Sequence, residues 1–422
     1  MTDLETVAII GAGLAGAKAA EALRKDGYDG RIAMFGDEPR LPYLRPPLSK
    51  DYLRGESELN TVLVQPQAWY DDHRIDLHVS TPVRAIEPAG RGLLLGDGSH
   101  FAFDRLLLAT GAGSRRLDIP GHDLAGVHYL RSLDDADAIR EAALAAHRVV
   151  VIGGGWIGAE VTASLRQLGL PVSMIAESSV PLERVLGAQV GGVYRDLHAE
   201  HGVEFVMNQR VAAFRGQTAV EAVETADGTR IEGNLVVVGV GAEPRTRLAR
   251  EAGLDVDNGI IVNEYLETGT PGIYAAGDVA AAWHPLLHVR LRVEHWDNAR
   301  RQGRTAARNM LGRGEPYARI PYFYSDQYDL GMEYAGYAPR WDRVIFRGEP
   351  ASRAFVAFWL HDGRVVAGMN ANVWHVNDAI SALVASGERV AIERLIDPTV
   401  PIDDLEALLL RQASAVGRAW VA

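Results

Sequence analysis

The sequence predicts an α/β fold that contains two copies of one βαβ unit and ends in an α+β module. Short apolar runs alternate with helix-like stretches, which is typical of parallel sheets covered by helices. A glycine-rich turn joins such a run to such a stretch twice, at residues 11–16 and 153–158, and the two turns are 142 residues apart. After about Gly314 aromatic residues become frequent and a meander of strands replaces the alternation.

Both units have the same order of elements: an apolar run, the glycine turn, a helix-like stretch, and a second apolar run that ends at an acid. These segments are 6–10, 17–25 and 31–35 in the first unit, and 148–152, 159–168 and 172–176 in the second. Further buried strands are predicted at 106–109, 235–240 and 273–276. In the terminal module we expect strands at 354–360 and 364–370 and helices at 376–384 and 403–412.

The turns GAGLAG and GGGWIG have the spacing that binds a dinucleotide pyrophosphate. In such a turn the first glycine permits a tight bend, the second lets the backbone approach the phosphates, and the third lets helix pack on strand. The helix that follows offers free N–H groups and a positive dipole end. The three positions are Gly11, Gly13 and Gly16 in the first turn, and Gly153, Gly155 and Gly158 in the second.

The acids that follow the second strand of each unit indicate which nucleotides bind. Asp37 and Glu38 in the first unit, and Glu177 in the second, lie where a carboxylate can accept from ribose hydroxyls. No Arg or Lys lies in residues 177–179 to meet a 2′-phosphate, which a carboxylate repels, so we expect NADH rather than NADPH. Two such sites predict two dinucleotides, and FAD with NADH is the natural pair.

Composition excludes several classes of protein. The sequence has no cysteine, so a disulfide framework, a thiolate metal site, an iron–sulfur cluster and a thiol redox centre are excluded. A net charge of −12 disfavours nucleic acid or an anionic membrane as partner. The start resembles no signal peptide, and no uncharged apolar stretch reaches about 18–20 residues, so we expect a cytoplasmic protein. His284 and His288 are separated by Pro285, and we predict no metal site.

Five segments carry a resemblance to a known family. They are GDEPRLPYLRPPLSK at 36–50, ATG at 109–111, YAAGD at 274–278, EHWDNA at 294–299 and YFYSDQY at 322–328. With these segments the chain resembles the NADH-dependent ferredoxin reductases of bacterial oxygenase systems, the putidaredoxin reductase-like pyridine nucleotide oxidoreductases. The likeness covers nearly the whole chain. Tyr322, Tyr324 and His375 depart from the family pattern and leave partner-side details open.

The resemblance implies which residues bind the cofactors. Around FAD it places Ala15, Asp37, Arg45, Lys50, Val83, Thr110, Gly111, Arg131, Gly277, Asp278 and Trp296. Around NADH it places Gly155, Ile157, Glu160, Glu177 and Gly241. Lys50, Glu160 and Trp296 are implied at the reactive edge of the flavin, where an ammonium stabilises the negative charge of reduced flavin and a carboxylate keeps it charged.

Each of these three residues also has a plainer interpretation. Lys50 could be a solvated loop cation, Glu160 an acid that complements a helix dipole, and Trp296 a core residue. The resemblance further implies a discontinuous FAD-binding domain at 1–112 and 236–315, an NADH-binding domain at 113–235, and a C-terminal domain at 316–422 on the flavin side that helps to form the partner interface.

The expected activity is electron transfer from NADH through FAD, one electron at a time, to a 2Fe-2S ferredoxin that serves a haem-thiolate monooxygenase or a Rieske dioxygenase. Because cysteine is absent, disulfide reductases and the cysteine-dependent peroxidases and oxidases of this scaffold are excluded. Two alternatives stay open: a rubredoxin reductase or NADH oxidase, and a redox-sensing binding protein resembling apoptosis-inducing factor.

A cluster of arginines is the candidate docking surface for an acidic ferredoxin. Seven arginines and only two acids lie between residues 290 and 313. Arg300, Arg304 and Arg308 recur every four residues and therefore fall on one helix face. In the resemblance Arg304 matches an arginine that contacts ferredoxin. A solvated helix face is the alternative, and nucleic acid is disfavoured because interleaved aromatic residues are lacking.

Overall fold

The computed structural model describes residues 4–410, which form two compact units. The first unit comprises residues 4–319 and 325–329, and the second comprises residues 320–324 and 330–410. The first unit contains both glycine turns, each at the carboxyl end of a strand in its own parallel sheet.

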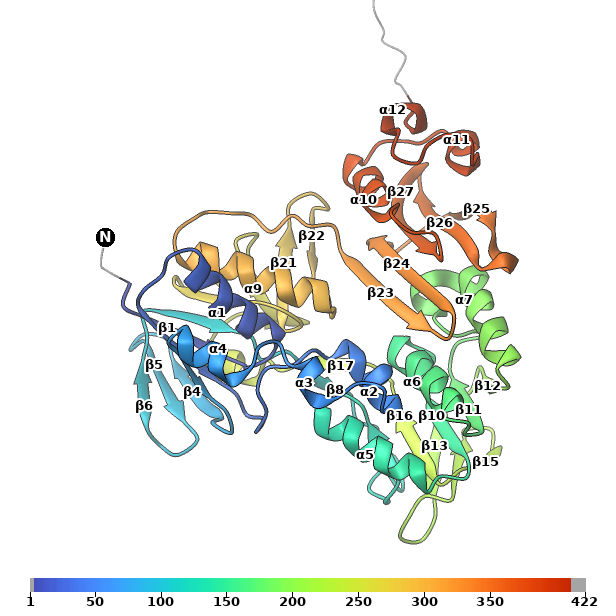
Figure 1. Cartoon of the computed structure of the whole chain (residues 1–422), viewed down its shortest axis with the longest axis horizontal. Coiled ribbons are helices and arrows are strands. Elements are labelled where there is room, and N and C mark those ends of the chain that lie inside the picture. Colours follow the sequence, from blue (N-terminus) through green and yellow to red (C-terminus); the bar gives the residue numbers. More distant parts are fainter. Residues whose placement is uncertain (1–3, 411–422) are drawn as a thin grey trace, which may run out of the picture. The chain divides into compact units, whose positions relative to one another are not determined.

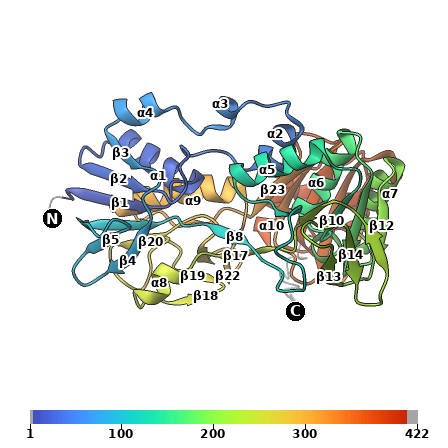
Figure 2. The ribbon, with the colours of Figure 1, turned by 90° about the horizontal axis from the view of Figure 1, so that it is seen from below.

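The first parallel sheet has the strand order β20–β7–β1–β2–β3. Figure 2 shows β1, β2 and β3 side by side. The strands are β1 (Thr6–Ile10), β2 (Arg31–Phe35), β3 (Ile75–His78), β7 (Arg105–Leu108) and β20 (Ile273–Ala275). Both faces of this sheet are covered, so β1 consists of a continuous apolar run, as parallel strands commonly do.

The second parallel sheet has the order β12–β11–β10–β16–β9 and repeats the arrangement of four strands of the first sheet. Its fifth strand, β9, comes before the others in the chain, whereas β20 comes after the others of its sheet. Its strands are β9 (Val127–Tyr129), β10 (Val149–Ile152), β11 (Val172–Ala176), β12 (Glu204–Met207) and β16 (Leu235–Val238). Val149 and Val151 pack into one core cluster, whereas Val150 and Ile152 pack into another. Successive side chains of a strand point to opposite faces, so both faces of this sheet are buried.

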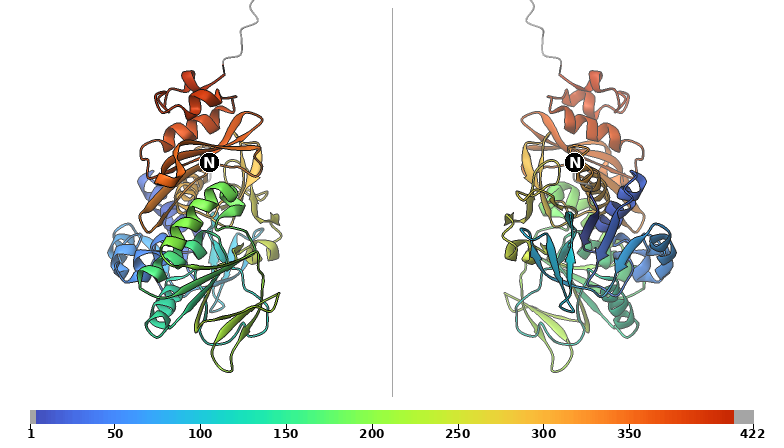
Figure 3. Two further views of the ribbon diagram at one scale, coloured as in Figure 1. Left: turned by 90° about the vertical axis from the view of Figure 1, so that its right-hand side faces the viewer. Right: turned by 90° about the vertical axis from the view of Figure 1, so that its left-hand side faces the viewer.

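Each parallel sheet is followed by a three-stranded antiparallel sheet before the chain returns to it. The first is β4 (Val83–Glu87), β5 (Gly92–Leu95) and β6 (His100–Ala102), and the second is β13 (Val211–Arg215), β14 (Ala222–Thr225) and β15 (Arg230–Glu232). Figure 3 shows the second one in yellow-green. The sequence repeat therefore extends over whole βαβ units with their antiparallel insertions.

The smaller sheets of the first unit join these parts. The pair β8 (Ala112–Ser114) and β17 (Ala242–Pro244) is antiparallel, and a four-stranded sheet has the order β18 (Val256–Asp257), β19 (Gly259–Val262), β21 (Ala280–His284) and β22 (Val289–Leu291). The chain crosses between the two parallel sheets through β8 and β17.

The helices of the first unit cover the sheets and connect them. They are α1 (Leu14–Lys25), the 3-10 helix η1 (Pro46–Ser49), α2 (Asp51–Arg54), α3 (Leu59–Val62), α4 (Gln67–Asp72), α5 (Leu133–Leu144), α6 (Trp156–Gln167), α7 (Glu183–Glu200, kinked at Gly187), α8 (Arg247–Glu251) and α9 (Trp296–Met310). Helices α1 and α9 lie side by side (Figure 1). A Cβ at Gly303 would lie 2.2 Å from the carbonyl oxygen of Ala15, so a glycine is needed for this close approach.

The second unit is built on an antiparallel sheet of order β23–β24–β27–β26–β25. Its elements are β23 (Tyr322–Gln327, which enters the first unit at Ser325), β24 (Leu330–Gly336), β25 (Arg343–Glu349), η2 (Pro350–Ser352), β26 (Ala354–His361), β27 (Arg364–Ala371), α10 (Asn377–Ser386), α11 (Ile392–Ile396) and α12 (Leu405–Leu408).

The helix expected at 403–412 is much shorter than the pattern indicates. Helix α12 ends at Leu408 because the next residues pair with an extended segment: Leu409 forms a bridge with Val390, and the Leu410 N–H donates to the Arg389 carbonyl oxygen at 2.8 Å. Residues 411 and 412 lie outside the described residues.

Candidate functional site

The first glycines of the two turns adopt the same left-handed backbone conformation. Gly11 has φ +113° and Gly153 has φ +103°, values that other residues rarely adopt. A Cβ at these positions would lie 2.1 Å from the Ala109 oxygen or 2.2 Å from the Gly239 oxygen. Each bend therefore requires glycine.

The other two glycines of each turn have contrasting surroundings. A Cβ at Gly16 or Gly158 would lie 2.2 or 1.9 Å from the carbonyl oxygen of the first glycine in its turn. A Cβ at Gly13 or Gly155 would meet no atom within 4 Å. Thus helix and strand close tightly at the last glycine, while the middle glycine faces open space that a ligand can enter.

Helices α1 and α6 begin at this open space. Their N-caps are Gly13 and Gly155, and no side chain caps either helix. The first-turn N–H groups and the positive end of each helix dipole are therefore available to an anion. The pyrophosphates of FAD and of a nicotinamide dinucleotide fit these two turns.

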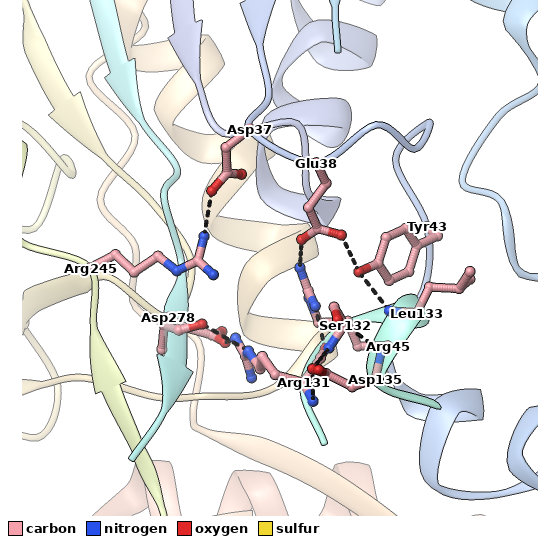
Figure 4. A network of polar contacts seen from close by, with 11 residues as sticks. Asp37, Glu38, Tyr43, Arg45, Arg131, Ser132, Leu133, Asp135, Arg245 and Asp278 are labelled. Atoms are coloured by element: carbon pink, nitrogen blue, oxygen red, sulfur yellow. Dashed lines mark hydrogen bonds and ion pairs between the residues drawn. The ribbon is translucent and has the colours of Figure 1, made fainter. Parts of the chain in front are cut away.

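Glu38, after β2, is held by two side chains (Figure 4). It accepts a hydrogen bond from the Tyr43 hydroxyl at 2.5 Å and pairs with Arg45 at 3.0 Å. Burial raises the pKa of Tyr43, so its hydroxyl stays protonated and can donate. The Leu133 N–H donates to the same hydroxyl at 3.1 Å, which ties the loop after β2 to the start of α5.

Asp37 has a different partner from Glu38 and is more exposed. Its carboxylate lies 3.0 Å from the Arg245 guanidinium, and its side chain is 59% exposed, against 28% for Glu38. An exposed ion pair contributes only about 0–1 kcal/mol. Asp37 can therefore exchange Arg245 for a ribose hydroxyl at small cost.

Arg131 and Asp278 form an ion pair close to these acids (Figure 4). The Arg131 Nε donates to the Ala112 oxygen at 2.9 Å, and its own carbonyl accepts from Arg45. Helix α5 begins next to it with a capping box between Ser132 and Asp135. Arg131 is thereby fixed by backbone and side-chain contacts on both sides.

Two more predicted FAD segments are held by hydrogen bonds of their backbone and side chains. Thr110 Oγ1 donates to the Arg245 oxygen and the Arg245 N–H donates to the Gly111 oxygen, both at 2.9 Å. The Gly277 N–H donates to the buried Gln302 Oε1 on α9 at 2.9 Å. These bonds hold the ends of β7 and β20 beside the turn.

Lys50 and Glu160 form a nearly buried ion pair although 110 residues separate them. Their charged atoms are 2.7 Å apart, and their side chains are 12% and 6% exposed. Glu160 also accepts from Ser49 and, at 2.7 Å, from Ser325. Lys50 is thus no solvated loop cation, and Glu160 has three donors besides any interaction with the dipole of α6. Their place at a flavin stays a prediction.

A buried chain of hydrogen bonds leads from Glu160 towards α7. Gln327 Nε2 donates to Ser325 Oγ at 3.2 Å, and the His198 Nε2 lies 2.9 Å from Gln327 Oε1. The Tyr328 hydroxyl lies 3.3 Å from the other ring nitrogen of His198. With His198 neutral and protonated at Nε2, each group donates to the next in the direction of Glu160. Burial lowers the pKa of His198 to about 4, which keeps the ring neutral at pH 7.

The start of α9 brings His295 near Lys50, and Trp296 is the next residue of the chain. Burial lowers the pKa of His295 to about 4; Asp297 and Asp278 oppose this shift, and the positive charge of Lys50 adds to it. The His295 Nδ1 accepts from the Asp297 N–H and caps the helix. Trp296 is half-buried with the Arg300 guanidinium 4.4 Å from its ring centre, so it is no plain core residue.

Glu177, directly after β11, has two arginine partners. Arg184 lies 3.4 Å and Arg210 lies 3.3 Å from its carboxylate. Residues 177–179 contain no cation, but two arginines that lie outside that segment reach the acid.

The arginines of α9 are also more neutralised than their order in the sequence indicates. Arg304 pairs with Glu21 of α1 at 3.2 Å, and Arg308 pairs with Asp26 at 2.9 Å. Arg300 pairs with the buried Asp297 at 3.0 Å. Arg304 and Arg308 remain 40% and 43% exposed, so the face they share is accessible but carries less net charge than predicted.

The remaining predicted residues differ in their exposure. Ala15 and Val83 are buried. Ile157, one residue into α6, is 42% exposed although apolar, and Gly241 has φ +110° with open space at its Cβ position. An exposed apolar side chain and an open backbone position are each suitable contacts for a nucleotide.

Sequence reasoning missed five residues that complete these sites: His198, Ser325, Gln327, Arg184 and Arg210. Ser325 and Gln327 alternate within YFYSDQY, so both point to one face of β23. The sequence alone therefore indicates that these two side chains lie on the same face of a strand. No pattern in the sequence places His198 or Arg210 beside residues so distant along the chain.

Comparison with known proteins shows the family of this chain. Residues 5–303 match the pyridine nucleotide-disulphide oxidoreductase family, and residues 322–406 match the reductase C-terminal family. The chain belongs to the pyridine nucleotide-disulphide oxidoreductase family. It does so without any cysteine, and therefore lacks the disulphide of the family's name.

Relatives of known function are similar over almost their whole length. The chain is 40% identical to the anthranilate 1,2-dioxygenase system ferredoxin–NAD(+) reductase component of Burkholderia cepacia, over 93% of this chain and 97% of that protein. It is 38% identical to putidaredoxin reductase of Pseudomonas putida, over 87% and 88%. The crystal structure of the covalent putidaredoxin reductase–putidaredoxin complex matches with a TM-score of 0.91 and 36% identity, over 96% of this chain and 98% of that chain.

The predicted fold class and family are thereby confirmed. Within residues 4–410, no helix combines the length and apolar character needed to cross a membrane. Over the same residues, no group of three or more His, Asp or Glu side chains could hold a metal ion.

Proposed function

We propose that this chain is an FAD-dependent ferredoxin reductase, which passes electrons from NADH to a 2Fe-2S ferredoxin. The observation that carries the proposal is the buried Lys50–Glu160 pair. Lys50 directly follows η1 in the first βαβ unit, and Glu160 lies in α6, the helix that begins at the second glycine turn. The relatives named as ferredoxin–NAD(+) reductase components of oxygenase systems support it. By the same reasoning, a monooxygenase or Rieske dioxygenase receives the electrons.

Bound FAD supplies a ring that accepts two electrons together and releases them singly. The protein binds and orients the two dinucleotides and offsets the charge that forms during the reaction. The two turns hold the pyrophosphates, and Asp37 and Glu177 accept from the riboses. Lys50, kept charged by Glu160, offsets negative charge at the reacting edge. NADH and two oxidised ferredoxins yield NAD⁺, one proton and two reduced ferredoxins, so one proton leaves to solvent in each cycle.

The same proposal includes the domain bounds, the ferredoxin-docking residues and the cellular location. The FAD-binding domain comprises 1–112 and 236–315, the NADH-binding domain 113–235, and the C-terminal domain 316–422. Arg300, Arg304 and Arg308 receive an acidic ferredoxin, and the protein works in the cytoplasm. The partial exposure of Arg304 and Arg308 supports their role.

The proposal is tested by anaerobic stopped-flow mixing of the purified holo-protein with NADH and then with an adrenodoxin-like 2Fe-2S ferredoxin. We expect loss of the flavin absorbance near 450 nm, followed by ferredoxin reduction that salt slows. Flavin reduction without electron transfer to ferredoxin, but with rapid oxygen consumption, would favour an NADH oxidase. If NADH leaves the flavin oxidised, the two-dinucleotide interpretation is wrong.

A further inference from the structure

Glu177 lies between two arginines that come from different elements. Arg184 is in the first turn of α7, and Arg210 immediately precedes β13. Their guanidinium nitrogens lie 3.4 and 3.3 Å from different oxygens of the same carboxylate. The acid that meets a ribose hydroxyl in the proposed NADH site thus has a cation on each side.

The backbone holds both arginines in place. The N–H groups of Asn208 and Gln209 donate at 3.0 Å to the carbonyl oxygens of Ser178 and Ala176, which fixes the segment before Arg210 against the turn after β11. On the other side, Glu183 accepts from the Ser179 N–H at 2.6 Å and anchors the start of α7. The backbone that carries each arginine is therefore fixed beside Glu177.

The charges and exposures favour an anion at this point. Arg184 and Arg210 are 83% and 76% exposed, whereas the Glu177 side chain is 52% exposed. Glu183 opposes an anion, but its carboxylate is engaged with the backbone. Exposed ion pairs contribute only about 0–1 kcal/mol, so both guanidinium groups can leave Glu177 for a phosphate, to which arginine binds in bidentate fashion.

We propose that Arg184 and Arg210 form a binding site for the 2′-phosphate of NADPH, so that NADPH is a second, weaker electron donor beside NADH. This inference rests on the proposed function, since the site is the ribose end of the same nucleotide cleft. Glu177 accepts from the 2′-hydroxyl of NADH. With NADPH it turns away, and the two arginines receive the phosphate.

Direct binding tests the proposal without turnover. Calorimetric titration of the oxidised holo-protein with 2′,5′-ADP and with 5′-ADP compares ligands that differ by the 2′-phosphate. We expect the 2′,5′-ADP dissociation constant to be less than about ten times that of 5′-ADP, because two arginines offset the repulsion from one acid. A larger ratio would overturn the proposal.

Substitutions identify the residues responsible. R184A and R210A should each weaken 2′,5′-ADP binding and NADPH kcat/KM by about tenfold, and change 5′-ADP and NADH much less. R195A is the matched control, since Arg195 is an exposed arginine of the same helix that pairs with its neighbour Asp196. E177Q should raise NADPH kcat/KM without any added cation. Equal effects of R184A or R210A on both nucleotides would contradict the site.

The two proposals fail in different ways. If NADH reduces the holo-protein but NADPH does not, and 2′,5′-ADP binds more than about tenfold more weakly than 5′-ADP, only the 2′-phosphate site is wrong. If neither nucleotide reduces the flavin although both ADP compounds bind, the 2′-phosphate binding site stands, whereas the proposed reductase activity fails and with it the role of NADPH as electron donor.

Discussion

Glu160 is the residue on which the proposed electron-transfer site most depends. It accepts from Ser49, Lys50 and Ser325 in a nearly dry position. Replacing it by Gln in E160Q removes the carboxylate that lies 2.7 Å from the Lys50 ammonium and substitutes a donor for an acceptor. We expect the rate constant of flavin reduction by NADH to fall roughly tenfold to a hundredfold, measured by anaerobic stopped-flow at saturating NADH.

The matched control is S325A, which removes one donor to Glu160 and keeps the carboxylate. Its effect should be no more than a few-fold, because Lys50 and Ser49 still hold the acid. Flavin content and nucleotide affinity are measured in both variants, so that a loss of cofactor is not mistaken for slow chemistry. Reduction of E160Q at the wild-type rate would show that the ion pair lies away from the reacting atoms.

His198 makes stability depend on pH. Burial lowers its folded pKa to about 4 from an ordinary value of 6.5, so between these values the unfolded chain binds a proton that the folded chain does not. Stability from this group is therefore complete above pH 6.5 and is lost as pH falls towards 4, with a slope of up to about 1.4 kcal/mol per pH unit.

We expect H198Q to lose less of its thermal midpoint than the wild type between pH 7.5 and pH 5, although it starts lower because Gln327 and Tyr328 lose a partner. The control is H122Q, at an exposed histidine outside the hydrogen-bonded chain. Parallel pH profiles for wild type and H198Q would mean that His198 is protonated or reoriented in the folded protein.

Helix α9 depends on one buried acid at its first turn. Asp297 is 4% exposed and lies 2.6 Å from Arg319, 3.0 Å from Arg300 and 3.2 Å from Arg301. Burial alone would raise the pKa of Asp297, but hydrogen bonds and charge from Arg319, Arg300 and Arg301 prevail and lower it. D297N would leave these cations without their carboxylate, and we expect a loss of about 3–5 kcal/mol in unfolding free energy.

Urea unfolding of the holo-protein measures this loss. D196N is the control, since Asp196 is an exposed acid of α7 that pairs with Arg195, and its effect should stay within about 0.5 kcal/mol. The Asp297 contribution is present above the ordinary pKa of 3.8 and disappears as pH falls below it, so the two variants should converge towards wild type in strong acid. A loss in D297N no larger than in D196N would exclude a structural role for the cluster.

At the scale of the whole molecule, short sequence motifs predict the fold, whereas contacts between residues far apart in the chain determine the partners of the charged side chains. The turns at Gly11 and Gly153 were readable because their geometry depends on a few consecutive residues. The sequence overstates the positive charge of α9, because Glu21 of α1 and Asp26 directly after α1 reach its arginines from far away in the chain. Arg210 was missed at the nucleotide site for the same reason. The net charge summed over a segment of the sequence therefore differs from the net charge of the surface that the segment forms.

The neutralised arginines lead to the last prediction, on ferredoxin docking. Arg304 is 40% exposed and pairs with Glu21. R304E reverses its charge and places a second carboxylate beside Glu21, so an acidic ferredoxin meets a repulsive surface. We expect the second-order rate constant of ferredoxin reduction to fall about tenfold or more at low salt, with a smaller difference at high salt, while ferricyanide reduction is unchanged.

Two controls separate docking from damage to the helix pair. E21Q removes the partner of Arg304 and keeps the arginine positive, so ferredoxin reduction should be equal to wild type or faster at low salt. R247E makes the same charge change on the exposed face of α8, away from α9 in the chain, and should have little effect. If R304E slows ferricyanide and ferredoxin equally, the substitution has disturbed the packing of α1 on α9, and Arg304 does not act by receiving the partner.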